Sequence, residues 1–229
     1  MNTVLITGGN RGIGFEVAKE LLQRNFKVYL GSRKLSNGLG AVEKLREFGT
    51  EVHPLELDVS NEDNIIKAAS EFKKQGSTLD VLINNAAILI DGKDKIDKLK
   101  SKIFNETISV NTLGPILVTQ RFLPFIKSPG RIINVSSGYG SLEIMTDNPP
   151  AYSISKTALN AVTKLFAYKL KDKNISVNSV SPGWVRTDMG GSEAPRSLQE
   201  GAETIVWLAN EAPINLTGRF LRDKNDLDW

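Results

Sequence analysis

The sequence predicts an α/β fold: one domain built on a doubly wound parallel sheet with helices on both faces. Strand-like and helix-like segments alternate along the chain, which is typical of consecutive βαβ units. Hydrophobic residues make up 40% and charged residues 24% of the 229 residues, proportions that suit a globular domain with a substantial core. No repeat, linker or low-complexity tract divides the chain. We therefore expect residues 1–229 to form one domain with right-handed crossovers between parallel strands.

The first half of the chain should supply four strands separated by three helices. The apolar run at residues 4–7 suits a buried strand, and the segment after it carries apolar Val17, Ala18 and Leu21 at helical spacing. In order, we expect strands over 4–7, 26–30, 52–57 and 79–83, and helices over 14–24, 39–48 and 62–74.

The second half begins with residues 92–102, where charges alternate, so we expect a solvated surface helix or loop there. A long helix should follow over about 103–126. The remaining elements are expected as a strand over 131–135, a helix that contains Tyr152 and ends near 171, a strand over 176–180, a helix over 198–209 and a last strand over 219–221.

Composition excludes several classes of function. The absence of cysteine excludes disulfides, thiolate catalysis and cysteine-based zinc sites. The single histidine, His53, lies in a strand-like run, which predicts a core or strand-edge role. One histidine cannot form a metal-binding cluster, so we expect no metal, and nothing supports a Ser-His-Asp triad. The net charge of +3 is small and spread along the chain, which gives no indication of nucleic-acid binding.

The first residues of the chain and its apolar runs indicate where in the cell the protein is expected. A strand is expected almost at the first residue, without a preceding basic region and apolar run, which argues against a signal peptide. The longest mostly apolar stretch, 81–90, contains two asparagines and is too short to span a bilayer. We therefore expect a cytoplasmic protein without a membrane partner.

A glycine-rich turn, Thr-Gly-Gly-Asn-Arg-Gly-Ile-Gly at residues 7–14, joins the first expected strand to the first helix. Glycines let the backbone approach a pyrophosphate, and a helix N-terminus presents free N–H groups to it. The spacing Gly8, Gly12, Gly14 differs from the common G-x-G-x-x-G pattern, whose final position is Val17 here. An ordinary glycine-rich turn is the alternative, but the order of strand, glycines and helix favours dinucleotide binding.

Tyr152 and Lys156 are four residues apart on an expected helix, which places both side chains on one face. A phenol has a pKa of about 10, and a nearby ammonium group lowers it by favouring the phenolate. Because two solvated side chains often show the same spacing, the pair alone is weak evidence for a proton donor.

Three motifs in order resemble those of the short-chain dehydrogenase/reductase family, whose fold is of the Rossmann type: the glycine-rich turn, the run Asn-Asn-Ala-Ala at 84–87, and Tyr-x-x-x-Lys at 152–156. The resemblance covers essentially the whole chain. The glycine-rich turn, the run Pro-Gly-Trp-Val-Arg-Thr-Asp-Met at 182–189 and the closing segment 218–229 are similar to carbonyl reductases. The chain departs from the family pattern at two points. Ala87 stands where a glycine is usual. Ser137 and Tyr152 are only 15 residues apart, so the long insertion of monomeric animal carbonyl reductases is missing.

The resemblance implies binding of NADP(H). Residues 31–34 offer no acidic side chain for a free ribose hydroxyl, whereas Arg33 and Arg11, expected across from it, suit the 2′-phosphate of NADPH. The glycine-rich turn would hold the phosphates, Asp58 and Val59 the adenine, Lys156 the nicotinamide ribose, and segment 182–187 the carboxamide. The implied cofactor-binding residues are Gly8, Asn10, Arg11, Gly12, Ile13, Gly14, Ser32, Arg33, Asp58, Val59, Asn85, Ala86, Ala87, Tyr152, Lys156, Pro182, Gly183, Val185 and Thr187.

The implied catalytic residues are Asn111, Ser137, Tyr152 and Lys156. Tyr152 would protonate a carbonyl oxygen, Ser137 would donate a second hydrogen bond to it, and Asn111 would hold a water molecule that relays protons to Lys156. Ser136 could take the place of Ser137, because adjacent residues of a strand point to opposite faces. The expected substrate wall is apolar, although its residues may equally belong to the core: Tyr139, Leu142, Ile144, Met145, Trp184 and Met189.

The resulting hypothesis is an NADPH-dependent carbonyl reductase acting on a small-molecule carbonyl substrate. The alternatives are a 3-oxoacyl-thioester reductase, which uses the same residues, and a non-catalytic protein that senses NADP(H). In this family the two long helices often pack against a second subunit, so we expect a homodimer or homotetramer. The expected apolar contact face is Leu117, Phe122, Phe125, Leu159, Val162, Phe166 and Leu170.

Overall fold

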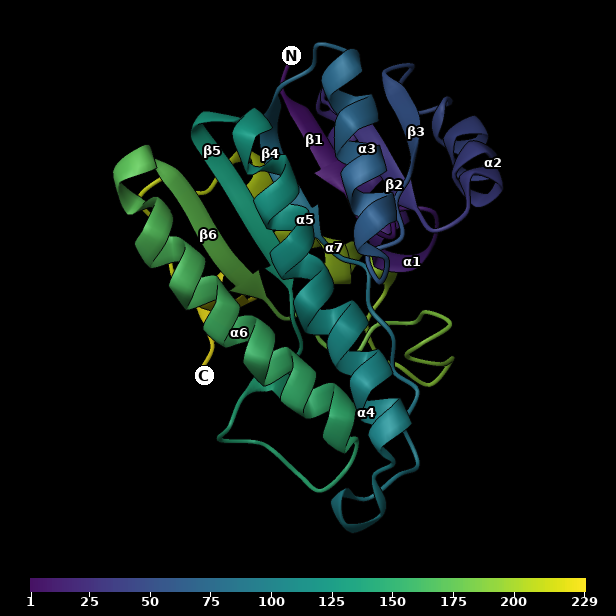
Figure 1. The fold of residues 1–229 in the computed structure, drawn as a ribbon, viewed down its shortest axis with the longest axis vertical. Coiled ribbons are helices and arrows are strands. Elements are labelled where there is room, and N and C mark those ends of the chain that lie inside the picture. The colour runs from purple at the N-terminus through teal and green to yellow at the C-terminus, as the bar shows by residue number, and fades with distance from the viewer.

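The computed structural model describes residues 1–229 and is organised around one eight-stranded sheet in the order β3-β2-β1-β4-β5-β6-β7-β8 (Figure 1). The first seven strands run parallel, and only β8 is antiparallel to its neighbour β7. The strands are β1 (Thr3–Ile6), β2 (Lys27–Ser32), β3 (Val52–Glu56), β4 (Leu79–Asn84), β5 (Ile126–Val135), β6 (Ile175–Val180), β7 (Phe220–Arg222) and β8 (Asn225–Asp226).

Helices cover both faces of the sheet, which confirms the predicted fold class (Figure 1). Buried side chains of α1, α2 and α7 pack on one face, and those of α3, α5 and α6 pack on the other. The helices are α1 (Gly12–Gln23), α2 (Leu35–Leu45), α3 (Glu62–Lys74), α4 (Ser101–Ile108), α5 (Gly114–Phe122), α6 (Pro150–Leu170) and α7 (Leu198–Asn210).

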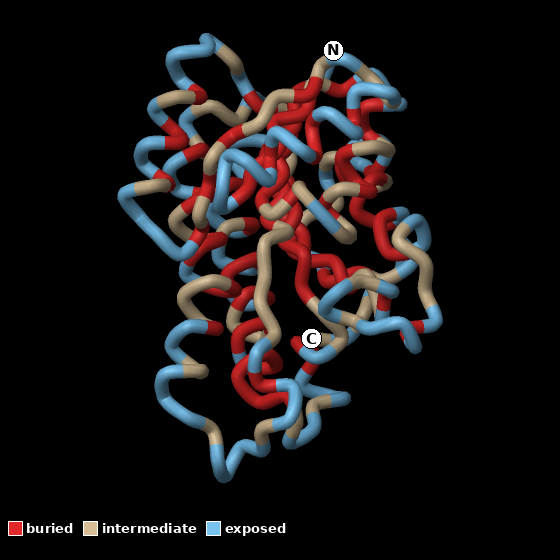
Figure 2. The backbone as a smooth tube through the Cα atoms, turned by 90° about the vertical axis from the view of Figure 1, so that its right-hand side faces the viewer, coloured by how far each residue is buried: buried red, intermediate tan, exposed pale blue.

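The central strands separate two apolar cores. In β1, Val4 and Ile6 belong to the core beneath α1 and α7, whereas Leu5 belongs to the core beneath α3 and α5. This alternation follows from the two-residue period of a strand. Figure 2 shows the buried strands as a red centre with exposed turns outside. Removing a fully buried side chain such as Leu5 should cost about 2–5 kcal/mol.

The expected single helix over 103–126 is wrong in two respects. A π-helical segment, Ser109–Leu113, interrupts it between α4 and α5. The helical chain also ends in a 3-10 turn, Leu123–Phe125, and β5 begins at Ile126. The proline in that turn has no N–H group to donate, so it favours an early end, while Ile126 pairs with Leu79 of β4.

Other expectations hold with small shifts of their ends. Residues 92–102 are mostly exposed and contain a 3-10 turn, Ile96–Lys98. His53 lies in the edge strand β3, with its ring 5.4 Å from that of Tyr29, which confirms the strand-edge role. The two-residue strand β8 was not expected, because so short a segment has no periodic pattern to detect. None of the helices combines the length and the apolar composition that crossing a bilayer requires.

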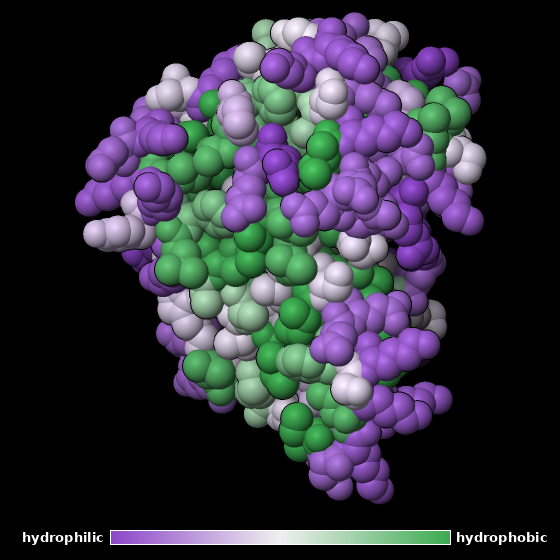
Figure 3. Space-filling view, viewed as in Figure 1, coloured by the Kyte–Doolittle hydropathy of each residue, from purple (hydrophilic) through white to green (hydrophobic).

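The apolar face expected between subunits is largely used inside the chain. Phe122, Leu159, Val162 and Leu170 are buried, so this part of the expectation is wrong. Phe122 and Leu170 belong to the apolar core on the face of the sheet that α3, α5 and α6 cover. Figure 3 shows that apolar side chains still gather over α5 and α6. The most exposed large ones on α6 are Leu165 and Tyr168, at 71% and 87% exposure.

Candidate active site

A cavity of about 1360 Å³ lies at the carboxyl ends of β1, β4, β5 and β6. The strand order reverses between β1 and β4, and ligands of open α/β sheets bind at such a switch point. Sites for single small molecules measure about 300–1,000 Å³. The cavity therefore has room for a dinucleotide together with a substrate.

The glycine-rich turn forms one wall of this cavity and fits a dinucleotide. Gly8 and Gly12 have φ angles of +63° and +57°, which other residues rarely adopt. A Cβ atom on Gly8 would lie 2.9 Å from the Cα of Ala86. The first turn of α1 has neither a side-chain cap nor an acidic residue, so its N–H groups are available to a phosphate.

The run at 84–87 holds this turn in place. The Thr7 hydroxyl accepts hydrogen bonds from the backbone N–H groups of Asn85 (2.9 Å) and Ala86 (3.0 Å). The Asn85 side chain donates to the backbone oxygens of Thr7 (2.9 Å) and Gly8 (3.1 Å). Gly14 lies behind the cavity lining, where a Cβ would come within 2.5 Å of the Asn85 amide nitrogen. Gly14 therefore serves close packing rather than direct contact.

The adenosine end contains most of the residues expected there. Asn10, Arg33, Asp58 and Val59 line the cavity. Ser32 does not, because its side chain is buried and its hydroxyl donates to the backbone oxygen of Lys34 at 2.9 Å. The Ser32 side chain is therefore not placed to contact the cofactor as expected. Its hydroxyl instead links the end of β2 to the start of α2.

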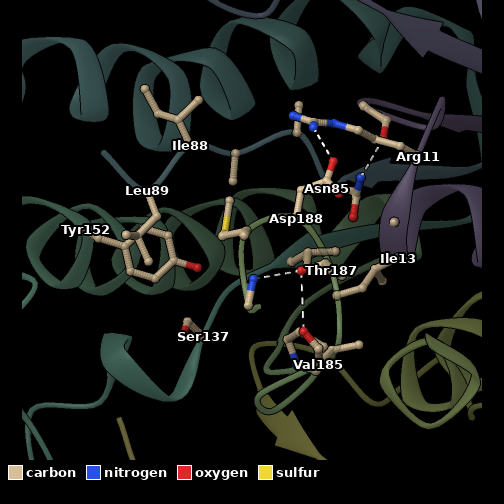
Figure 4. Close-up of a pocket in the computed structure, with 18 of the residues that line it drawn as sticks. Arg11, Ile13, Asn85, Ile88, Leu89, Ser137, Tyr152, Val185, Thr187 and Asp188 are labelled. Atoms are coloured by element: carbon tan, nitrogen blue, oxygen red, sulfur yellow. Dashed lines mark hydrogen bonds and ion pairs between the residues drawn. The ribbon is translucent and has the colours of Figure 1, made fainter. Parts of the chain in front are cut away.

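Arg11 does not extend toward Arg33 as expected. Its guanidinium pairs with the Asp188 carboxylate at 2.5 Å across the cavity (Figure 4). Both side chains are more than 70% exposed, so this ion pair contributes little stability. The pair joins the glycine-rich turn to the loop after β6, which also supplies Pro182, Gly183, Val185 and Thr187 to the cavity lining.

The other end of the cavity brings Tyr152, Ser137 and Lys156 together. Figure 4 shows the Tyr152 phenol within the cavity and the Ser137 side chain beneath it. Lys156 lies one turn along α6, with its Nζ 5.6 Å from the centre of the Tyr152 ring, and it donates to the backbone oxygen of Val135 at 2.7 Å. The Ser136 hydroxyl instead donates to the backbone oxygen of Lys156 at 3.4 Å. The geometry thus favours Ser137 over Ser136 as partner of the phenol.

Burial controls the titration of this pair. It raises the pKa of Tyr152 to about 12, with the charges of Tyr139 and Asp91 acting in the same direction and hydrogen bonding to Ser137 opposing it. Burial also lowers the pKa of Lys156 to about 7. In the ligand-free protein, burial thus opposes the lowering of the Tyr152 pKa that we expect from Lys156. The reason is that burial disfavours both charged forms, and Lys156 is itself only partly charged near pH 7.

Asn111 lies outside the cavity lining, in the π-helical segment, and its side chain is fully buried. Its amide donates to the backbone oxygen of Ile88 (2.8 Å) and to the Ser155 hydroxyl (3.0 Å), and its oxygen accepts from the N–H of Ile88 (2.8 Å). Asn111 therefore fixes the cavity wall at Ile88 against α6. Because its side chain already makes these contacts, the structure does not support the expected role of Asn111 in holding a water molecule.

Four of the six residues expected in the substrate wall line the cavity: Tyr139, Ile144, Trp184 and Met189. Leu142 and Met145 lie outside it. Two charged residues near this end, Asp91 and Arg222, are not among those expected from the sequence. No local pattern indicates either residue, because their partners are distant in the chain.

Comparison with known proteins adds independent information. Residues 2–198 match the short chain dehydrogenase family. A short-chain dehydrogenase of Penicillium roqueforti, anuI, is 31% identical over 98% of this chain and 95% of its own length. Carbonyl reductase (NADPH) 1 of Sus scrofa is 30% identical over 98% of this chain and 93% of its own. The structure of the carbonyl reductase Sniffer of D. melanogaster superposes with a TM-score of 0.89 at 30% identity, covering 100% of both chains.

Proposed function

The chain belongs to the short-chain dehydrogenase family, and on this premise we propose that it is an NADPH-dependent oxidoreductase that reduces ketones or aldehydes to alcohols. The observation that carries the proposal is the Tyr152 phenol in the cavity beside Ser137, with Lys156 one turn further along α6. A carbonyl oxygen gains negative charge during reduction, so it needs a hydrogen-bond donor and then a proton. These side chains offer both.

NADPH, when bound, would supply the hydride. The uncapped start of α1 and the glycine-rich turn support binding of the pyrophosphate. Arg33 supports the 2′-phosphorylated form, because it is exposed at the cavity and makes no ion pair. The name of the pig relative also joins NADPH to carbonyl reduction.

In this proposal Tyr152 protonates the carbonyl oxygen while Ser137 donates a hydrogen bond to it. A pKa of about 12 keeps the phenol protonated throughout the neutral range, which is the form that reduction requires. A positioned acid contributes roughly 10²–10⁴ in rate and a hydrogen-bond donor to a developing oxyanion roughly 10²–10³. Lys156 holds the end of β5 through Val135 and would also bind the nicotinamide ribose.

The test is the loss of NADPH absorbance when the purified protein meets a panel of aldehydes, ketones and 3-oxoacyl thioesters. Turnover of simple carbonyl compounds supports the proposal. Turnover of the thioesters alone would assign a 3-oxoacyl-thioester reductase instead. NADPH binding without turnover of any compound would indicate a sensing role.

A further inference from the structure

Arg222, the last residue of β7, has a guanidinium in the wall of the cavity. Its Nη2 donates to the Ser181 hydroxyl at 3.0 Å. The same nitrogen lies against Gly138, because a Cβ atom added to that glycine would collide with it. Gly138 directly follows Ser137, so the guanidinium stands on the same side of the cavity as the proposed hydrogen-bond donor.

This guanidinium lacks an acidic partner. Arg222 forms no ion pair, and the adjacent carboxylate of Asp223 is held by Arg196 at 2.6 Å. Its Nε is buried and has no hydrogen-bond partner. A guanidinium offers five N–H donors, and only one hydrogen bond is formed here. Because Arg222 is half-buried and lines the cavity, it brings there a positive charge that no ion pair balances, which points to an anionic group on the ligand.

The other arginines of the cavity either already have hydrogen-bond partners in the protein or lie at the adenosine end. Arg11 pairs with Asp188, and Arg186 donates to the backbone oxygens of Ala194 (2.9 Å) and Pro195 (2.8 Å). Arg33 directly follows β2 and lies at the adenosine end of the cavity. Arg222 is therefore the arginine with free donors at the end that contains Tyr152.

Apolar side chains line the cavity between Arg222 and Tyr152. The Cδ1 atom of Ile144 would lie 3.7 Å from a Cβ on Gly138, and the Tyr139 ring is 6.3 Å from that of Tyr152. Trp184, which is 57% exposed, lines the same cavity. A matching ligand has an apolar body and one anionic group.

We propose that Arg222 binds a carboxylate of the substrate, so that the preferred substrates are apolar carbonyl compounds that carry a carboxylic acid. This inference rests on the proposed carbonyl reductase function. A guanidinium grips a planar carboxylate through paired, charge-assisted hydrogen bonds. The carboxylate would satisfy the free donors of Arg222 and orient the carbonyl group toward Tyr152 and Ser137.

The test compares the ortho, meta and para formylbenzoates, each with its neutral methyl ester, as substrates with NADPH. We expect kcat/KM for at least one acid to exceed that of its ester by tenfold or more, consistent with charge-assisted hydrogen bonds. Arg222→Gln should lower kcat/KM for the acid by tenfold or more and for its ester by a much smaller factor, so that the acid-to-ester ratio falls toward one. Arg46→Gln, at an exposed arginine paired only with Glu43, is the matched control.

Esters reduced as well as acids by the wild-type protein would overturn the inference and leave the proposed function intact. Equal loss of acid and ester activity in Arg222→Gln would also overturn it. If no carbonyl compound is reduced, the proposed function fails, and ligand binding then tests the inference. Benzoate but not methyl benzoate should change the tryptophan fluorescence of the protein, and Trp184→Phe should remove that signal. Arg222→Gln should abolish the difference between the two ligands. If Arg222→Gln does not fold, the wild-type protein is assayed at increasing salt concentrations instead. The KM should then rise for the acids and not for the esters, because salt screens the attraction between the guanidinium and the carboxylate.

Discussion

The Asp91 carboxylate accepts a hydrogen bond from the backbone N–H group of Tyr152 at 3.2 Å, and the same oxygen accepts one from Ala151 at 2.6 Å. Asp91 is buried in the segment after β4, and its carboxylate lies against the N-terminus of α6, where the helix dipole favours a negative charge. Its charge also contributes to raising the pKa of Tyr152. One carboxylate thus both positions the phenol and helps to keep it protonated.

Asp91→Asn should move the alkaline limb of carbonyl reduction to lower pH. Reduction requires the protonated phenol, so activity falls as the pH rises through the pKa of Tyr152, and losing the Asp91 charge lowers that pKa. The groups that remain near the phenol are Ser137, Tyr139 and Lys156. The measurement is kcat/KM against pH, with Asp97→Asn, at an exposed residue, as the control. An unchanged limb in Asp91→Asn would contradict this role.

Lys156 should make the stability of the ligand-free protein depend on pH. Its pKa is lowered from 10.5 to about 7 in the folded state, so the unfolded state binds more protons between these values. Stability therefore rises with pH across this window. Lys156→Met should flatten the rise and stabilise the protein at pH 7 by up to about 4 kcal/mol, reduced by the lost hydrogen bond to Val135. Urea unfolding at pH 7 and pH 9 measures this, with exposed Lys169→Met as the control.

Arg33→Asp should reverse the cofactor preference. The wild-type protein should use NADPH with a much higher kcat/KM than NADH, because Arg33 would bind the 2′-phosphate. An aspartate there repels that phosphate and can accept a hydrogen bond from a free ribose hydroxyl. We expect the NADPH/NADH ratio to fall by about 10²-fold, equivalent to about 2.7 kcal/mol. Lys34→Asp is the matched control, because Lys34 lies outside the cavity lining. A wild-type preference for NADH would refute the assignment.

The exposed apolar side chains of α6 should lie between two copies of the chain. Leu165 and Tyr168 remain exposed on this helix, and a second copy could cover them together with half-buried Leu117 and Phe166. We expect a symmetric dimer or tetramer by light scattering at micromolar concentration. Leu165→Glu should dissociate it, whereas Lys169→Glu nearby should not. A wild-type monomer under these conditions would exclude the assembly.

Features that depend on local patterns could be predicted from the sequence, and features that depend on distant contacts could not. The glycine-rich turn and the Tyr152–Lys156 spacing are local, and the structure brings Tyr152 and Lys156 together in one cavity. Asp91 reaches Tyr152 across 61 residues, and Arg222 reaches Ser181 across 41. The π-helical segment spans only five residues, too few for hydrophobic periodicity to reveal it. The pKa values of Tyr152 and Lys156 follow from burial, which spacing alone does not show.

Tyr152→Phe separates proton donation from cofactor binding, when the variant and the wild-type protein are compared in NADPH oxidation by a carbonyl substrate and in NADPH binding. The substitution removes only the phenolic oxygen, so the fold and the glycine-rich turn should persist. We predict that the wild-type protein consumes NADPH, that Tyr152→Phe loses at least about 10² in kcat, and that the NADPH Kd of the variant stays within about threefold. A Tyr152→Phe variant that reduces carbonyl compounds at the wild-type rate would show that Tyr152 is not the proton donor.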